Sequence, residues 1–145
     1  MKKTKYPIYV ISKGRADIGH TANFMLKDGV KFKLVIEPQE YDDYAKYYDE
    51  KLLMVTPFSN LGKGSIPVRN FIWEDALEKG YKRHWCFDDN IHNIKYFWNG
   101  RRIVVNGNVG ISAVEEFTDR YENIAISGMN YKFFVTPMNK KPFYQ

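Results

Sequence analysis

The chain has 145 residues, enough for one compact domain with a substantial core. Its 22 Lys and Arg residues outnumber 17 Asp and Glu, and the net charge of +5 favours anionic partners such as nucleotides or nucleic acid. A single cysteine, Cys86, excludes an intrachain disulfide and a cysteine-based metal cluster. The sequence has no apolar run of transmembrane or signal-peptide length, so we expect a cytoplasmic protein without membrane association.

The first half of the chain predicts strands that alternate with helices. Short β-rich runs are expected at residues 8–11, 33–37, 52–55 and 84–87. Helices are expected at residues 21–26 with Thr21 as the cap, at residues 39–49, and between the cap Ser65 and the stop at Gly80. Four such alternations favour a mainly parallel α/β sheet flanked by helices, in a single domain of residues 1–145.

The second half gives a looser pattern. A short strand is expected at residues 103–105, and a helix from Ser112, with Glu115 completing a capping box, to about residue 121. Further strands are expected at residues 124–126 and 133–136, and residues 137–145 carry no clear element. The three tryptophans are expected in the core rather than as stacking platforms.

The strand expected at residues 84–87 ends in Asp88, Asp89 and Asn90. Two adjacent carboxylates repel each other unless a cation or strong donors lie between them. Ligands of open α/β sheets bind at the carboxyl ends of the strands. The motif therefore predicts a site for a divalent metal and a phosphate, and the alternative is a solvated loop with an Asx turn.

A basic loop, Ser12-Lys13-Gly14-Arg15, follows the first strand. Backbone amides near a glycine, together with two cations, suit an anionic ligand. The spacing of a P-loop and that of a dinucleotide fingerprint are both absent from the sequence. The alternative interpretation is an ordinary basic surface turn.

Two charged residues elsewhere fit the same hypothesis. Glu37 closes the second strand, where an acid often accepts hydrogen bonds from a ribose or a base, although a solvated loop acid remains the alternative. Arg69 lies early in a predicted helix, where the helix dipole disfavours a cation, so a bound phosphate or a nearby acid should accompany it. We expect His84 to be a packed histidine, whereas His92 could reach a metal or substrate.

Four segments in this order resemble a known family. They are residues 12–16 (SKGRA), 35–41 (VIEPQEY), 60–70 (NLGKGSIPVRN) and 84–90 (HWCFDDN). The set is similar to nucleotide-sugar glycosyltransferases of the GT-A type, and more narrowly to the TET/JBP-associated glycosyltransferases of phages and some eukaryotes. Those enzymes are thought to glycosylate hydroxymethylated pyrimidines in DNA. The resemblance covers residues 6–90 well and residues 124–144 loosely.

The resemblance implies a GT-A-like, Rossmann-like fold whose donor-binding half is best defined at residues 6–90. It implies a transferase that moves a sugar from a UDP-sugar to a hydroxymethylated pyrimidine in DNA. The Asp-rich motif would hold Mn²⁺ or Mg²⁺ through Asp88 and Asp89, with Asn90 in support. Residues 127–131 would lie near the acceptor. The donor nucleotide would be bound by Ser12, Lys13, Gly14, Arg15, Glu37, Arg69 and Asp88.

This sequence departs from the family pattern in two respects. The usual Asp-x-Asp is Asp-Asp-Asn here, which leaves open which side chain contacts the metal. The family pattern is also longer than this chain, so we expect a C-terminally truncated domain without the acidic motif that activates the acceptor. The residues identify no catalytic base, and Asp89 is the residue that we expect to contribute most to catalysis.

Two other functions fit the same residues. A sugar nucleotidyltransferase would share the metal and nucleotide pocket, but the glycine-rich N-terminal loop expected of it is absent. A non-catalytic nucleotide-binding or DNA-binding interaction module is the second alternative. Release of pyrophosphate would identify the first, and donor binding without transfer would support the second.

Overall fold

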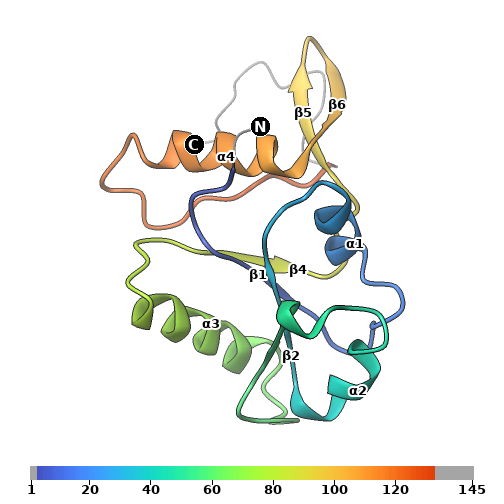
Figure 1. Cartoon of the computed structure of the whole chain (residues 1–145). Coiled ribbons are helices and arrows are strands. Elements are labelled where there is room, and N and C mark those ends of the chain that lie inside the picture. The colour runs from blue at the N-terminus through green and yellow to red at the C-terminus, as the bar shows by residue number, and fades with distance from the viewer. Residues whose placement is uncertain (1–2, 133–145) are drawn as a thin grey trace.

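Four short strands form one parallel sheet in the computed structural model, which describes residues 3–132. They are β1 (Ile8–Ile11), β2 (Lys33–Ile36), β3 (Leu53–Val55) and β4 (Trp85–Asp88), and their spatial order is β3-β2-β1-β4. The predicted parallel α/β sheet is confirmed (Figure 1). Because β1 pairs with β2 on one side and with β4 on the other, the strand order reverses between β1 and β4.

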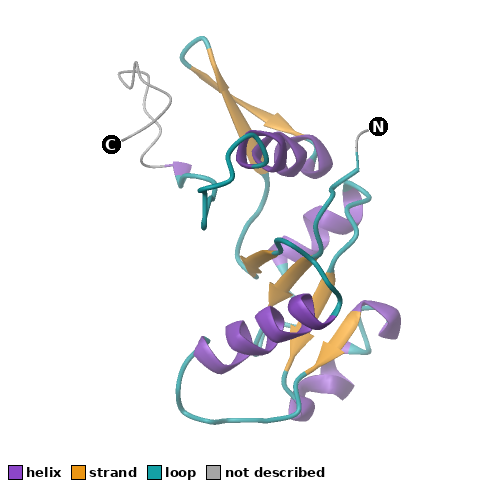
Figure 2. Ribbon diagram, turned by 90° about the vertical axis from the view of Figure 1, so that its left-hand side faces the viewer, coloured by secondary structure: helices purple, strands orange, loops and turns teal. Residues whose placement is uncertain are grey.

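Each face of the sheet is covered, as a parallel sheet requires. Helix α3 (Ile66–Glu78) packs on one face, where its Ile72 and Ala76 lie against Tyr9 and Val35. The opposite face packs against α1 (His20–Lys27) and α4 (Gly107–Thr118), and its core includes Met25 from α1. Figures 1 and 2 show α3 and α1 on opposite sides of the sheet. Alternate strand residues thus feed two separate apolar clusters.

Two predicted helix caps are wrong. Helix α1 begins after Gly19, and Thr21 is buried inside the helix, where its hydroxyl donates to the Asp88 carbonyl at 2.6 Å. Helix α4 begins five residues before Ser112, because Asn106 caps it by accepting a hydrogen bond from the Asn108 amide. Glu115 is therefore a buried acceptor for the Lys5 and Tyr6 amides rather than part of a capping box. Ser65 does occupy the N-cap position of α3, but its hydroxyl makes no capping bond.

The tyrosine-rich segment predicted as one helix at residues 39–49 is broken. It forms a 3₁₀ turn at Pro38–Glu40, a single helical turn α2 (Tyr41–Tyr44), and a second 3₁₀ turn at Glu50–Leu52. Asp49 caps the second 3₁₀ turn, since its carboxylate accepts a hydrogen bond from the Lys51 amide. Tyr44 and Tyr48 are buried, whereas Tyr47 is exposed, so the tyrosines do not form one common face.

A β-hairpin follows the sheet in place of the single short strand expected at residues 103–105. Strand β5 (Ile94–Trp98) pairs antiparallel with β6 (Arg101–Val105). The turn residues Asn99 and Gly100 both have positive φ, +46° and +75°, as a type I′ turn requires. An Asn-Gly pair between β-rich runs is the sequence signal that predicts this turn.

The remaining expectations for the second half have mixed outcomes. Residues 124–126 are irregular rather than a strand, and the expected strand at residues 133–136 and the tail at residues 137–145 lie outside the described residues. Trp85 is partly buried against the core, but Trp73 and Trp98 are largely exposed, contrary to the prediction for all three tryptophans. Within residues 3–132, no helix has the length and apolar character needed to span a bilayer.

Candidate active site at the switch point of the sheet

The loops after β1 and β4 meet where the strand order reverses. The register pairs Ile11 with Asp88, so the loop that begins at Ser12 lies beside the carboxylates that end β4. In open α/β sheets this reversal opens the crevice in which ligands bind. The strand order therefore brings together the basic loop and the acidic motif, which are more than seventy residues apart in sequence.

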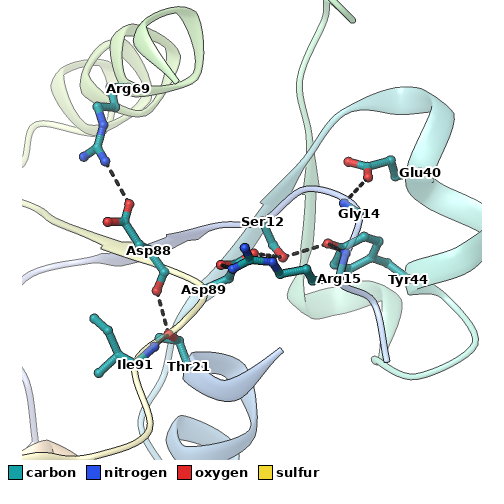
Figure 3. Close-up of polar contacts among 10 residues, drawn as sticks. All are labelled: Ser12, Gly14, Arg15, Thr21, Glu40, Tyr44, Arg69, Asp88, Asp89 and Ile91. Atoms are coloured by element: carbon teal, nitrogen blue, oxygen red, sulfur yellow. Dashed lines mark hydrogen bonds and ion pairs between the residues drawn. The ribbon is translucent and has the colours of Figure 1, made fainter. Parts of the chain in front are cut away.

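Asp89 is held by the first loop. Its Oδ1 lies 2.7 Å from Nη1 of Arg15, and its Oδ2 accepts from Ser12 Oγ at 2.9 Å (Figure 3). Tyr44 OH accepts from the Arg15 amide and lies 2.7 Å from Ser12 Oγ. Because each hydroxyl carries one proton, Tyr44 donates to Ser12, and Ser12 donates to Asp89. Burial raises the pKa of Tyr44 above its ordinary value, which keeps it a donor.

Asp88 points toward α3 and pairs with Arg69. The Asp88 Oδ1 to Arg69 Nη2 distance is 2.9 Å, and Arg69 Nη1 also donates to Cys86 Sγ at 3.3 Å. Burial raises the pKa of the Cys86 thiol. Asp88 is therefore the nearby acid that the position of Arg69 early in the helix led us to expect. Asp88 and Arg69 are each about half exposed, at 51% and 45% of the side chain, whereas only 12% of Asp89 is exposed.

Glu37 is held by three donors. Its Oε2 accepts from Lys13 Nζ at 2.8 Å, from the Asn60 amide at 3.0 Å and from Gln39 Nε2 at 2.6 Å. Burial alone would raise the pKa of Glu37, but these three hydrogen bonds outweigh it and lower the pKa to about 2. Glu37 is thus an ionised anchor for the loop at Asn60, and the interpretation as a solvated loop acid is wrong.

A hydrogen bond between Gly14 and Glu40 lies at the same edge of the sheet. Gly14 has a φ of +65°, and its amide donates to Glu40 Oε1 (Figure 3). The second carboxylate oxygen of Glu40 is buried and has no hydrogen-bond partner among the described residues. A buried acceptor without a partner costs free energy, so a donor from a ligand would stabilise it.

Thr21 fixes the backbone of the acidic turn. Besides its bond to the Asp88 carbonyl, its Oγ1 accepts from the Ile91 amide at 2.9 Å, and its own amide donates to the Asp89 carbonyl at 3.1 Å. Asn90 is exposed at the tip of this turn. The neighbouring His92 stacks on His20, with ring centroids 3.9 Å apart.

Sequence reasoning missed four members of this edge: Thr21, Gln39, Glu40 and Tyr44. Glu40 and Gln39 follow directly on Glu37, so their proximity to the strand end was a usable signal. Thr21 and Tyr44 reach the site from helices, and their positions depend on tertiary packing. By contrast, His84 is half-buried beside the Tyr9 ring, as predicted for a packed histidine, and burial lowers its pKa.

The acceptor segment predicted at residues 127–131 packs beside α4. Ser127 Oγ lies 2.8 Å from Thr118 Oγ1, and Met129 contacts the core cluster. Its role toward an acceptor stays a prediction.

The carboxylates of Asp88 and Asp89 are the candidate ligands for a divalent metal at this edge of the sheet. Within residues 3–132, no group of three or more His, Cys, Asp or Glu side chains is arranged to hold a metal by itself. Two adjacent carboxylates, one of them half exposed, fit the way Mg²⁺ and Mn²⁺ bind through one or two protein carboxylates together with substrate phosphates. Asp88 and Asp89 thus supply the type of ligand that such a cation prefers, and their binding of a metal stays a prediction.

These features define a class of protein. A parallel sheet in the order β3-β2-β1-β4, with a basic loop and an acidic pair at its switch point, is a Rossmann-like α/β domain. Over residues 6–145 the chain matches the model of the TET-Associated Glycosyltransferase family, and it belongs to that family. The resemblance found from the sequence is confirmed. Comparisons with curated proteins and with solved structures found no match.

Proposed function

We propose that this glycosyltransferase uses a UDP-sugar as donor and a hydroxymethylated pyrimidine in DNA as acceptor, with Mn²⁺ or Mg²⁺ at Asp88 and Asp89. The observation that carries the proposal is the set of three ion pairs at the switch point: Lys13 with Glu37, Arg15 with Asp89, and Arg69 with Asp88. Membership of the TET-Associated Glycosyltransferase family supports sugar transfer and makes a DNA acceptor plausible.

The two arginine pairs explain how a diphosphate could enter. Arg15 and Arg69 are neutralised by the two carboxylates that also suit a metal. A diphosphate that arrives with a divalent cation supplies new partners to both sides, anionic oxygens to the guanidinium groups and a cation to the carboxylates. Binding therefore leaves no charge of this site unpaired.

The nucleoside end would lie over the loop at Gly14. Glu40 Oε2 is the acceptor that lacks a partner there, so it suits a ribose hydroxyl or a base N–H. Glu37 would act through its bond to Lys13, which it holds in position beside the loop.

In the transfer step, an acceptor hydroxyl oxygen forms a bond to the anomeric carbon while the bond from that carbon to the diphosphate oxygen breaks. UDP departs with the electron pair, and the hydroxyl proton passes to a base. Arg15 and Arg69 would stabilise negative charge as it develops on the diphosphate. A bound divalent cation would supply the same stabilisation as a Lewis acid. An acceptor base in DNA must be single-stranded or flipped from the stack to reach the site.

Calorimetric titration of UDP, and then of UDP-glucose, into the chain with and without Mn²⁺ tests the donor site. We expect metal-dependent binding that is lost in Asp88→Ala and Asp89→Ala and retained in Asp43→Ala, whose partner Lys46 is on the surface. Transfer is then assayed on an oligonucleotide with a hydroxymethylated pyrimidine. Pyrophosphate release would indicate a nucleotidyltransferase, donor binding without transfer a non-catalytic module, and no binding in any condition would refute the donor site.

A further inference from the structure

The β5–β6 hairpin, residues 94–105, projects away from the sheet beside α4 (Figures 1 and 2). It is anchored at its base, where Ile94 is buried in the core and contacts α4 around Gly110. Beyond this base the strands extend toward the turn at Asn99 and Gly100. The hairpin is therefore a fixed arm with an accessible end.

One face of the hairpin is aromatic and accessible. The antiparallel register places Tyr96 opposite Ile103 and Trp98 opposite Arg101, and alternation puts these four side chains on the face of the buried Ile94. Tyr96 and Trp98 are 53% and 58% exposed, and their rings stack with centroids 6.3 Å apart. Two stacked, exposed rings in a row form a platform of the kind on which successive nucleic-acid bases stack.

The charge of the hairpin is of one sign. Residues 94–105 contain three cations, Lys95, Arg101 and Arg102, and no Asp or Glu. The register pairs Arg101 with Trp98 on the aromatic face, and alternation places Lys95 on the opposite face. Cations that flank stacking rings are complementary to a phosphate backbone whose bases are unstacked.

The hairpin is also close to the donor edge along the chain. Only three residues separate Asn90 from Ile94, so the base of the hairpin lies within about 14 Å of the acidic turn even if the link is fully extended. The turn is itself fixed by Thr21, and His92 in the link stacks on His20. The base of the hairpin is therefore tied closely to the turn that carries the carboxylates.

From these observations we infer that the hairpin binds the acceptor strand, a single-stranded segment of DNA whose bases stack on Tyr96 and Trp98 and whose phosphates contact Arg101. The inference rests on the proposed function, because it assigns the acceptor side of that same site. It separates the enzyme into a donor edge on the sheet and an acceptor arm on the hairpin.

The test measures the affinity of a fluorescein-labelled, 12-nucleotide single strand with one hydroxymethylcytosine for the full chain by fluorescence anisotropy. We expect Trp98→Ala to weaken binding by about tenfold, and Tyr96→Ala to do so to a similar extent. Trp73→Ala is the matched control, since Trp73 is an equally exposed tryptophan on α3, and it should leave the affinity unchanged. Arg101→Gln should reduce the slope of log affinity against log salt by about 0.7.

Further measurements distinguish the possible outcomes. A duplex of the same sequence should bind more weakly than the single strand, and equal affinities would overturn the stacking interpretation. An affinity unaffected by Trp98→Ala and Tyr96→Ala would also overturn it. Sedimentation that showed the wild type to be a dimer and the hairpin variants to be monomers would overturn it as well.

Melting temperature and calorimetric UDP binding are measured on each variant. Retained UDP binding with lost DNA binding supports the acceptor arm. If UDP does not bind while DNA binding still depends on the hairpin, the donor proposal fails and the acceptor arm stands.

Discussion

The donor edge of the sheet and the hairpin each contain three cations, but the surroundings of those cations differ. At the donor edge Lys13, Arg15 and Arg69 each lie within ion-pair distance of a carboxylate. The hairpin contains three cations and no acidic residue. An anion that enters the donor edge must therefore exchange with existing partners, whereas a phosphate backbone meets no carboxylate within the hairpin itself.

The donor edge and the hairpin therefore favour different ligands. An edge whose cations already have partners favours a ligand that brings its own cation, because only such a ligand satisfies both the arginines and the aspartates. The hairpin offers exposed aromatic rings and cationic side chains, which accept any single strand. We therefore expect the donor edge of the sheet to select its ligand by chemistry, and the hairpin to tolerate different acceptor sequences.

The largest effect is expected from Asp89→Asn, which removes the charge of the more buried carboxylate while keeping its shape. Arg15 would lose its ionic partner, and the site would lose one of its two anionic metal ligands. We expect sugar transfer to fall about 100-fold or more, while single-stranded DNA still binds at the hairpin. Asp43→Asn is the matched control. Transfer at the wild-type rate in Asp89→Asn would contradict the assignment of the donor edge.

A smaller effect, on stability, is expected from Gly110→Ala. An added Cβ would overlap the Ile94 side chain, which anchors the hairpin to α4. We expect the free energy of unfolding, measured with urea, to fall by about 2 kcal/mol, and DNA affinity to fall more than UDP affinity. Gly128→Ala is the control for the stability measurement, because a Cβ there meets open space. An equal loss of both affinities would show that the two regions are not separable.

The smallest effect concerns acid stability at the donor edge. The pKa of Glu37 is about 2 in the folded chain and near 4.5 in the unfolded chain, so its contribution is complete above about pH 4.5 and is lost as the pH falls toward 2. Since its partner Lys13 is half exposed, we expect a contribution of about 1 kcal/mol. Comparing urea unfolding of the wild type and Glu37→Gln at pH 7 and pH 3 measures it, with the exposed Glu78→Gln as control. A difference between the wild type and Glu37→Gln that did not shrink at pH 3 would contradict the role of the ionised carboxylate.

Much of the donor edge could be predicted from the sequence. Ser12, Glu37 and Asp88 each stand at the end of a β-rich run, and parallel strands bring such ends to one edge. The sequence predicted Tyr44 only as part of a helix at residues 39–49, because its hydroxyl contact with Ser12 joins segments thirty-two residues apart. The sequence left open whether the partner of Arg69 is a phosphate or an acid. The position of α3 beside β4 places Arg69 at ion-pair distance from Asp88.

The second half of the chain was predicted less well. The Asn99-Gly100 turn carries a clear local signal, but the exposure of Trp98 depends on what the hairpin packs against. The capping box at Ser112 matched a local pattern, yet Asn106 caps the helix instead and lies at hydrogen-bond distance from the Asp28 carbonyl. A local pattern fails when a distant partner offers a better bond.

The sequence by itself determined that the chain forms a parallel α/β sheet and which strands end in polar residues, because hydrophobic periodicity and turn residues act over a few neighbouring positions. Only the tertiary structure decided that β1 lies next to β4, that Asp89 pairs with Arg15 and Asp88 with Arg69, and that the hairpin exposes its aromatic face. The physical reason is that strand order and side-chain partners are selected by packing between distant segments. The free energy of that packing depends on the whole core rather than on any local pattern.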